Sequence, residues 1–238
     1  MQGSLFKIKK TEMNYVHQIY GLFNDNENMS NLFMESHNCF KSWAKKNQYQ
    51  YILWGEKECN ELIDIEYPEY FEMYKKTRFP IMKCDIIRLC ILHQYGGLYA
   101  DLDCFPKIER MKDSGLVLTI DKTSSGTKRK NGKEVVTNEI IQASKGNLFL
   151  TKFLDYIKTQ IIEKEKIEAY KQRKARFVCH TTGPYALQRF LKNNKFEYDV
   201  YKTNQLEFSK NWKYLGLGDT KNVDFIAHNS LAWYSCLK

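Results

Sequence analysis

The segment Ile81–Tyr95 is apolar over most of its length, and the stretch GLYADLD follows it directly. The apolar run is long enough for a buried helix, and Gly96–Gly97 occupies the position of a C-terminal helix cap. GLYADLD predicts a short buried strand that carries Asp101 and Asp103 at its end. A buried helix that turns directly into a buried strand restricts the chain to folds in which helices pack against a sheet.

The rest of the chain alternates expected strands with expected helices. We predict strands at 14–20, 49–54 and 115–121, with strand and loop from 200 to 238. Helices are predicted at 30–47, 56–65, 68–76, most of 148–176, and 185–193; 138–143 is expected to be a short helix or turn, and RFVCHTTGP a short strand and turn. This alternation predicts an α/β fold with a mostly parallel central sheet flanked by helices. We expect a single domain over 1–238, with the first dozen residues flexible.

The net charge of +9 raises the question of an anionic partner. The basic residues are spread widely, and the segment IIEKEKIEAYKQRKARF alternates glutamate with lysine, as a solvated helix face does. A basic face directed at anionic lipid or at a phosphate-bearing substrate is the second interpretation. No reader motif for nucleic acid is present, so we expect no nucleic-acid partner.

The seven cysteines include no C-x-x-C pair, which argues against a zinc framework or a secreted disulfide scaffold. The N-terminal segment MQGSLFKIKKTEMNYV lacks the apolar core of a signal peptide. No stretch approaches the roughly 20 apolar residues that span a bilayer. From these features we expect a cytoplasmic protein that is soluble or peripheral at a membrane surface through its basic faces.

The two aspartates of GLYADLD are the first candidates for chemistry. In an extended strand, Tyr99, Asp101 and Asp103 point to the same face, which places the carboxylates about 6–7 Å apart. Two neighbouring carboxylates repel each other unless a cation lies between them, and oxygen ligands of this kind suit Mg²⁺ or Mn²⁺. A solvated turn at the end of a strand explains an isolated D-x-D equally well.

The helix before the strand contains Asp85 and Arg88, three residues apart in a segment that is apolar nearly all round. Buried charges need partners, so one interpretation is an ion pair that serves only the fold. The other is that both groups face one ligand, the arginine toward phosphate or sugar oxygens and the aspartate toward sugar hydroxyls.

The segment CDIIRLCILHQYGGLYADLDCFP resembles the core of the DXD-containing sugar transferases of glycosyltransferase family 32. That family includes bacterial capsule and lipopolysaccharide enzymes, yeast initiating mannosyltransferases and, more distantly, the catalytic domains of clostridial glucosylating toxins. The shared pattern is D-x-x-R-x-x-x-L-x-x-x-G-G-x-Y-x-D-x-D, and Cys84 stands where small residues such as serine are usual. The resemblance implies the GT-A glycosyltransferase fold.

Four further segments resemble family elements and occur in the family's order. NYVHQIY resembles its opening strand and SWAKKNQYQYILW the segment after it. TNEIIQASKGN resembles an element that reaches the donor sugar, and TTGP resembles a turn. FIAHNSLAW resembles a late H-x-x-x-x-W element. The resemblance therefore extends over nearly the whole chain.

The resemblance implies a metal site and a nucleotide site. Asp103 would bind the metal directly, with Asp101 contacting the ribose and the metal shell and His228 as a further ligand. The nucleotide would be contacted by Tyr20, stacked on the base, by Tyr99, and by Trp233, which would close over the donor. Mn²⁺ or Mg²⁺ and a nucleotide-sugar donor are the implied cofactors, with a UDP-hexose preferred over GDP-mannose.

The resemblance also implies the sugar-binding residues and the reaction. Asp85 and Arg88 would hold the donor sugar, while Asn138 and Glu139 would contact it or stabilise an oxocarbenium-like transition state; loop capping explains Asn138 and Glu139 as well. His17 in an apolar strand is more simply explained as a hydrogen-bonded core histidine.

The function expected from the sequence is metal-dependent, retaining transfer of a hexose to a hydroxyl of a glycan or glycolipid. Capsular, lipopolysaccharide and viral glycans are the acceptors considered. A toxin-like glycosyltransferase acting on a protein acceptor is the alternative within the same chemistry. A non-catalytic protein that binds nucleic acid or membrane is the alternative from another class.

Overall fold

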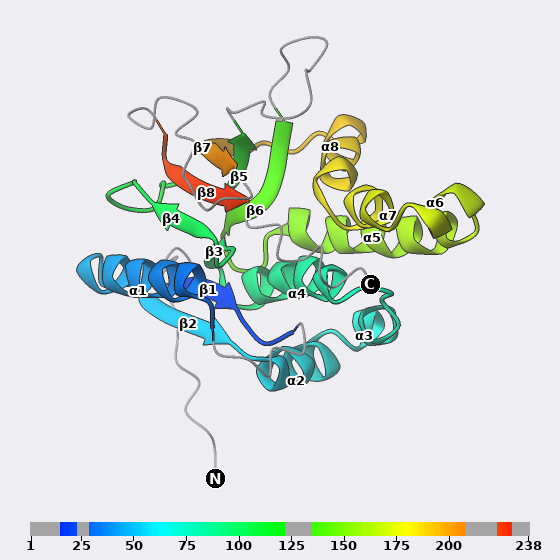
Figure 1. Cartoon of the computed structure of the whole chain (residues 1–238), viewed down its shortest axis with the longest axis horizontal. Helices are drawn as coiled ribbons and strands as arrows, with labels where there is room; N and C mark the ends of the chain where they lie inside the picture. Colours follow the sequence, from blue (N-terminus) through cyan, green and yellow to red (C-terminus); the bar gives the residue numbers. More distant parts are fainter. Residues whose placement is uncertain (1–14, 23–28, 122–134, 208–222, 230–238) are drawn as a thin grey trace.

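The computed structural model describes residues 15–22, 29–121, 135–207 and 223–229. In these ranges the strands form one sheet of eight, in the order β2-β1-β3-β6-β5-β7-β8-β4, and Figure 1 shows its course. The strands are β1 (Tyr15–Ile19), β2 (Gln50–Trp54), β3 (Gly97–Ala100), β4 (Cys104–Pro106), β5 (Leu116–Asp121), β6 (Val135–Ala143), β7 (Asp199–Glu207) and β8 (Phe225–Asn229).

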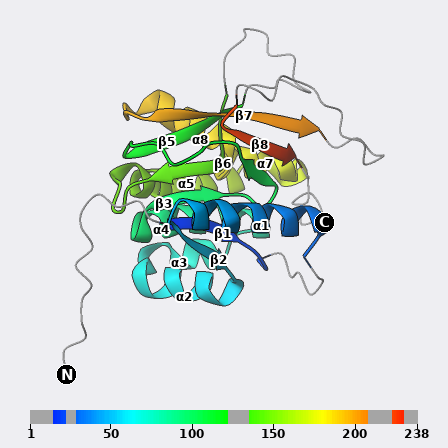
Figure 2. The same ribbon diagram turned by 90° about the vertical axis from the view of Figure 1, so that its left-hand side faces the viewer.

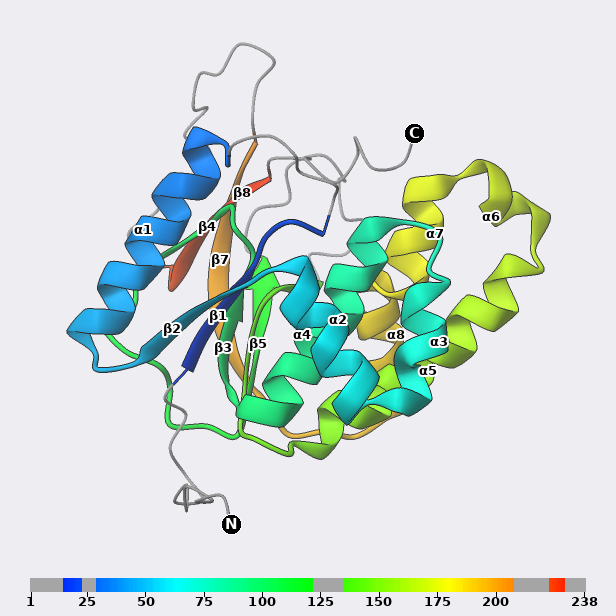
Figure 3. The ribbon, with the colours of Figure 1, turned by 90° about the horizontal axis from the view of Figure 1, so that it is seen from below.

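Helices cover both faces of this sheet. They are α1 (Asn31–Lys46), α2 (Glu56–Glu66), α3 (Pro68–Lys75), α4 (Pro80–Tyr95), α5 (Leu148–Glu165), α6 (Glu168–Gln172), α7 (Lys174–Thr181) and α8 (Pro184–Asn193). Figure 3 shows α1 alone on one side of the strands and the other labelled helices on the opposite side. Figure 2 shows α1 running across the middle of the sheet.

Two apolar cores follow from this arrangement. Phe40 and Trp43 of α1 pack with Leu98 and Phe225 of the strands in one core. The second core lies on the other face and joins the buried side chains of α4 to those of α2, α3, α5, α7 and α8. Four of the seven strand pairings, β1–β2, β1–β3, β5–β7 and β7–β8, are parallel. The predicted α/β fold with a mostly parallel sheet flanked by helices is confirmed.

The two glycines after α4 are required by the backbone. Gly96 and Gly97 have φ angles of 70° and 103°, a region that residues with a side chain rarely adopt. A Cβ on Gly97 would lie 2.2 Å from the carbonyl oxygen of Tyr15 on the neighbouring strand. The chain can therefore turn from α4 into β3 only because both positions are glycine.

His17 supports the same junction from β1. Its ring is fully buried; Nε2 lies 2.9 Å from the carbonyl oxygen of Gly96, and the indole N–H of Trp54 donates to Nδ1 at 3.1 Å. Burial lowers the pKa of His17 to about 4, so the ring is neutral near pH 7 and donates to Gly96 through Nε2–H. The interpretation of His17 as a hydrogen-bonded core histidine is confirmed.

Two predicted elements are wrong. Residues 138–143 belong to β6, which pairs antiparallel with β3 and β5. Asn138 and Glu139 line the pocket described below and Gln142 is a buried polar residue, so the three together hide the strand pattern. RFVCHTTGP begins in α7, where Phe177, Val178 and Thr181 are buried at helical spacing. Packing of that face against the core outweighs the β propensity of the segment.

Two further expectations from the sequence concern membrane crossing and cysteine pairing. Across the described ranges, no helix has the length and apolar character to cross a membrane. Cys39, Cys59, Cys84, Cys90, Cys104 and Cys179 are free thiols. Cys236 and the first fourteen residues lie outside the described part of the chain.

Candidate active site

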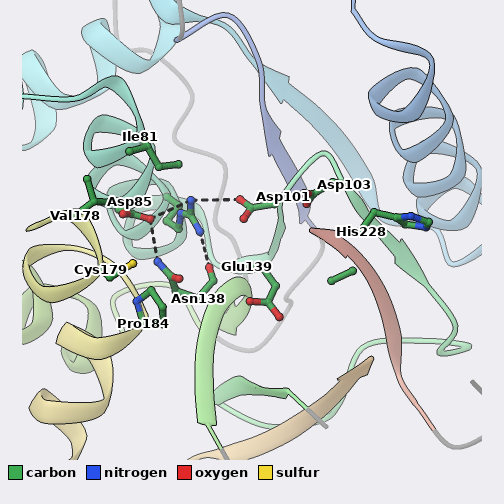
Figure 4. Close-up of a pocket in the computed structure, with 13 residues that line it drawn as sticks. Ile81, Asp85, Asp101, Asp103, Asn138, Glu139, Val178, Cys179, Pro184 and His228 are labelled. Atoms are coloured by element: carbon green, nitrogen blue, oxygen red, sulfur yellow. Dashed lines mark hydrogen bonds and ion pairs between the residues drawn. The ribbon is translucent and has the colours of Figure 1, made fainter. Parts of the chain in front are cut away.

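A pocket of about 210 Å³ opens where β3 and β6 meet α4 and the turn between α7 and α8. Figure 4 shows charged side chains from several elements gathered around it. Its lining residues are Ile81, Asp85, Arg88, Asp101, Asp103, Asn138, Glu139, Val178, Cys179, Gly183, Pro184, Ala227 and His228. Seven of the predicted site residues are therefore brought together: Asp85, Arg88, Asp101, Asp103, Asn138, Glu139 and His228.

The two aspartates lie in a turn rather than in an extended strand. β3 ends at Ala100, and the N–H of Cys104 donates to the carbonyl oxygen of Asp101 at 3.1 Å, which closes the turn. The N–H of Asp101 donates to the carbonyl oxygen of Glu139 at 2.9 Å. The strand alternation used to place both carboxylates on one face therefore does not apply, and the turn presents them to the pocket instead.

Arg88 connects α4 to this turn. Its guanidinium lies 3.2 Å from the carboxylate of Asp85 and 3.2 Å from that of Asp101, and it stacks over the ring of Tyr99 at 4.7 Å. It also donates to the carbonyl oxygen of Asn138. The side chain is only 2% exposed, so its charge depends on these partners. Burial lowers the pKa of Arg88, but Asp101, Tyr99 and Asp85 raise it by more than burial lowers it, so the net shift is upward and the group is a permanent cation.

Asp85 is held by three donors from three parts of the fold. Besides Arg88, the amide of Asn138 donates to Oδ1 at 2.9 Å and the hydroxyl of Thr182 donates to Oδ2 at 2.6 Å. Burial, helped by the charge of Asp101, raises the pKa of Asp85 by more than Arg88 and the hydrogen bonds from Thr182 and Asn138 lower it, so the net shift is upward. An aspartate next to an arginine with this many donors is held as a carboxylate in one fixed orientation.

Asp101 is partly exposed, and a hydrogen bond from Tyr99 orients its carboxylate. The hydroxyl of Tyr99 donates to Oδ1 of Asp101 at 2.6 Å. Burial raises the pKa of Asp101 by more than Arg88 and the hydrogen bond from Tyr99 lower it, so the net shift is upward. Tyr99 is buried, and it acts on the pocket through Asp101; its predicted contact with the nucleotide stays a prediction.

Glu139 lies beside the acidic turn on β6. The hydroxyl of Thr203 donates to its Oε1 at 3.2 Å. Burial raises the pKa of Glu139 to about 7, and the neighbouring charge of Asp101 adds to the rise. Near neutral pH the carboxyl group of Glu139 therefore populates both its neutral and its charged form, a property often found at catalytic sites.

The side chains of the three predicted metal ligands do not converge on one metal position. The N–H of His228 donates to the carbonyl oxygen of Asp103 at 2.7 Å, but its ring packs against Phe105 at 5.1 Å. Figure 4 shows this ring pointing away from Asp101. No group of three or more His, Cys, Asp or Glu side chains among the described residues is placed to hold a metal.

Asp101 and Asp103 nevertheless fit a metal of the expected kind. Mg²⁺ and Mn²⁺ in nucleotide-dependent enzymes are commonly held by one or two carboxylates, with waters and substrate phosphates as the other ligands. The turn offers two carboxylates at the edge of a pocket, and a diphosphate would supply further oxygens. The predicted ligand role of His228 stays a prediction.

The remaining predicted nucleotide contacts are Tyr20 and Trp233. Tyr20 follows β1, and its N–H donates to the carbonyl oxygen of Trp54 at 2.9 Å. It is not among the pocket-lining residues. Trp233 lies outside the described residues. Both stay predictions.

Sequence reasoning missed Thr182 and the apolar wall of the pocket. Ile81, Val178 and Cys179 line the pocket, and Thr182 holds Asp85 from behind it. The segment TTGP was predicted to form a turn, but its sequence does not show that Thr182 contacts Asp85, 97 positions earlier. The two residues meet only in the folded chain, where α7 and α8 pack on α5 and α5 packs on α4.

Comparisons with known families relate the part of the chain that carries the acidic turn and Arg88 to glycosyltransferases of the DXD class. Residues 34–116 match the family described as "Glycosyltransferase sugar-binding region containing DXD motif". Residues 83–178 match the "TcdA/TcdB catalytic glycosyltransferase domain". The stretch 34–116 thus matches the DXD-containing sugar-transferase family, in agreement with the family and the enzyme class predicted from the sequence.

Curated relatives match part of the chain. A mannosyl phosphorylinositol ceramide synthase of Saccharomyces cerevisiae is 44% identical over 55 residues, which are 23% of this chain and 14% of that protein. Inositol phosphoceramide mannosyltransferase 1 of Schizosaccharomyces pombe is 30% identical over 101 residues, which are 42% of this chain and 30% of that protein. The chain thus spans well under half the length of these relatives.

Two solved structures show a weaker likeness. The PaToxG glycosyltransferase has a TM-score of 0.48 and 17% identity, covering 76% of this chain and 69% of the other. A glycosyltransferase involved in glycosylating the major capsid of PBCV-1 has a TM-score of 0.39 and 8% identity, covering 94% and 96%. Both scores are too low to carry an argument about the site.

Proposed function

We propose that this protein transfers a hexose from a nucleotide diphosphate sugar to a hydroxyl group, with a divalent metal and with retention of the anomeric configuration. The observation that carries the proposal is the position of Arg88, which pairs at 3.2 Å with Asp85 on one side and with Asp101 of the D-x-D turn on the other. Arg88 thus connects Asp85, which suits a sugar hydroxyl, with Asp101, which suits a metal bound to a diphosphate. Retention rests on the family resemblance alone.

In this proposal Asp103 and Asp101 hold Mn²⁺ or Mg²⁺ against the diphosphate of the donor. The metal would neutralise charge on the departing diphosphate when bound. Asp101 is kept charged and oriented by Arg88 and Tyr99. Tyr20 and Trp233 are proposed to contact the base and to close over the donor, and His228 to complete the metal shell.

The sugar end of the donor would lie between α4 and β6. Asp85 offers an acceptor to a sugar hydroxyl at the pocket surface, and Asn138 and Glu139 line the same wall. Polar groups fixed before the substrate arrives stabilise developing charge without reorganising, which is the main source of electrostatic catalysis. We assign Asn138 and Glu139 to the face where positive charge develops on the sugar.

The donor is proposed to be a nucleotide hexose, and two candidates need comparison. The sequence led us to prefer a UDP-hexose, whereas the curated relatives are named as enzymes that transfer mannose. Those names favour GDP-mannose. The acceptor is proposed to be a glycan or glycolipid hydroxyl, since the relatives' names describe an inositol phosphoceramide acceptor. A cytoplasmic, soluble or membrane-peripheral location belongs to the same proposal.

A protein acceptor is the second candidate. Residues 83–178 match the TcdA/TcdB catalytic glycosyltransferase domain, and this match is the observation that favours a protein acceptor. The donor pocket and its residues would be the same in both cases. Only the acceptor would differ, so the two are separated by acceptor assays and not by donor binding.

The deciding experiment is thermal stabilisation by nucleotides and nucleotide sugars, with Mn²⁺, with Mg²⁺ and with EDTA. We expect GDP-mannose or a UDP-hexose to raise Tm only when metal is present. Donor hydrolysis and transfer to glycolipid, glycan and protein acceptors would then be measured with the stabilising donor. Absence of any metal-dependent stabilisation, together with salt-sensitive binding to nucleic acid or anionic vesicles, would establish the non-catalytic alternative instead.

A further inference from the structure

Thr182 reaches the pocket without lining it. Its side chain is 1% exposed and its hydroxyl donates to Oδ2 of Asp85 at 2.6 Å. The same hydroxyl lies 3.5 Å from the carbonyl oxygen of Val178, a longer and weaker alternative. The contact joins α4 to the turn between α7 and α8 across 97 positions of sequence.

The turn that carries Thr182 is fixed by its own backbone. The N–H groups of Thr182 and Gly183 both donate to the carbonyl oxygen of Val178, at 3.0 and 3.1 Å. A Cβ on Gly183 would lie 3.0 Å from the Cα of Cys179, so the turn packs tightly on α7. Thr182 therefore offers its hydroxyl to Asp85 from a rigid support.

The acceptor sites of Asp85 can be counted. A carboxylate accepts about four hydrogen bonds, two at each oxygen. Oδ1 already accepts from Asn138 and from Arg88, at 2.9 and 3.2 Å. Oδ2 accepts from Thr182, which leaves one acceptor site, and Asp85 lines the pocket. The remaining site is the one that a sugar hydroxyl can use.

We propose that Thr182 is a positioning residue that fixes Oδ2 of Asp85 so that its one remaining acceptor site meets a hydroxyl of the donor sugar. This inference rests on the proposed function and adds a residue to it. Without the Thr182 hydroxyl, the carboxylate is free to turn about its last bond, and Oδ2 loses the partner that holds it. The residue acts on the sugar and not on the nucleotide, because Asp85 is the side chain to which its hydroxyl bonds within the described part of the chain.

The test compares two adjacent buried threonines. Thr182→Val and Thr182→Ala remove the hydroxyl that reaches Asp85, and Thr182→Ser keeps it. Thr181→Val is the matched control: Thr181 is equally buried, but its hydroxyl donates only to the carbonyl oxygens of Phe177 and Val178. Each variant is assayed with Mn²⁺ for binding of GDP-mannose, UDP-glucose, GDP and UDP, and for donor turnover.

We expect Thr182→Val to lower kcat/KM by about 10-fold to 100-fold, the range seen when a group that orients a ligand-binding side chain is removed. Affinity for the nucleotide sugar should fall toward that of the bare nucleotide, whose own affinity should stay unchanged. Thr182→Ser should restore both values, and Thr181→Val should keep the preference for the sugar-bearing nucleotide. Thr182→Ala gives the same comparison if the valine variant folds poorly.

Two results would overturn the inference alone. One is a folded Thr182→Val that binds and turns over the donor as the wild type does. The other is a parallel loss in Thr181→Val and Thr182→Val, affecting bare nucleotide and nucleotide sugar equally, which is the behaviour of a purely structural threonine. A wild-type protein that binds no nucleotide sugar with any metal would instead overturn the proposed function, and this inference with it.

Discussion

The guanidinium of Arg88 lies 3.2 Å from the carboxylate of Asp101, so a helix residue and the first aspartate of the D-x-D turn form an ion pair. Arg88 is 2% exposed and Asp101 is 31% exposed. The buried cation thus supports a carboxylate that still reaches the solvent side of the pocket. This asymmetry suits a residue that must bind a ligand while keeping a fixed orientation.

Removing the cation should damage both stability and binding. Arg88→Ala leaves Asp85 and Asp101 without their shared charge, and breaking a buried pair in this way costs about 3–5 kcal/mol. We expect that loss in the free energy of unfolding, measured by urea titration, together with loss of donor binding. Arg110→Ala changes an exposed arginine and should alter stability by less than about 0.5 kcal/mol. Equal effects of both substitutions would contradict the role given to Arg88.

Asp103 should affect metal-dependent binding and leave the fold intact. Asp103→Ala removes one proposed metal ligand from a turn, and we expect turnover to fall by about 100-fold or more. The Tm of the metal-free protein should be nearly unchanged, while the rise in Tm with donor and Mn²⁺ should disappear. Asp113→Ala removes an exposed aspartate and serves as the control. A full Mn²⁺ response in Asp103→Ala would exclude Asp103 as a ligand.

Glu139 should make stability depend on pH. Burial raises its pKa from 4.5 in the unfolded chain to about 7 in the fold. Between these values the folded state binds more protons than the unfolded state, so the contribution of Glu139 to stability falls as pH rises through the window. Glu139→Gln removes this dependence. In EDTA, the Tm of the variant minus that of the wild type should therefore increase from about pH 5 to about pH 8.

A control substitution separates this effect from the overall titration of the protein. Glu109→Gln changes an exposed glutamate, and its Tm difference from the wild type should stay flat over the same pH range. A Tm difference for Glu139→Gln that decreases with pH would show that the folded state favours the charged form of Glu139.

Gly97 should be far less tolerant of substitution than Gly146, although both have positive φ. Alanine at Gly97 would place a Cβ 2.2 Å from the carbonyl oxygen of Tyr15, and we expect a loss of at least about 3 kcal/mol in the free energy of unfolding. Gly146 has φ +72° and nothing within 4 Å of an added Cβ, so only backbone strain of about 1–2 kcal/mol applies. Similar losses at both glycines would show that β1 shifts to accommodate the methyl group.

The α/β class and most of the elements could be predicted because their signals are local. The apolar run before Gly96 and the Ser30 cap mark α4 and α1 within a few residues. The strand β6 could not be found in this way. Asn138, Glu139 and Gln142 interrupt its apolar pattern. Asn138 and Glu139 line the pocket, whereas Gln142 is buried and accepts hydrogen bonds from Lys112 and Tyr201.

The site could be predicted in its residue types and less well in its geometry. Asp85, Arg88, Asp101 and Asp103 lie within one stretch of sequence, and their spacing pointed to a shared ligand. The extended-strand placement of the aspartates was wrong, because the hydrogen bond from Cys104 to Asp101 bends the chain immediately after β3. Thr182 could not be found at all, because its role depends on a contact between distant segments.

The bonds of Asp85 to Asn138 and Thr182, which are 53 and 97 positions away, also determine when the pocket can form during folding. Contacts between such distant segments require large loops to close, and they arise late compared with local helices. A chain that has formed α4 but has not yet docked β6 and the α7–α8 turn can pair Asp85 with Arg88, but Asp85 still lacks its hydrogen bonds from Asn138 and Thr182. The same network that would recognise a sugar thus favours completing the fold over stopping at a partly assembled sheet.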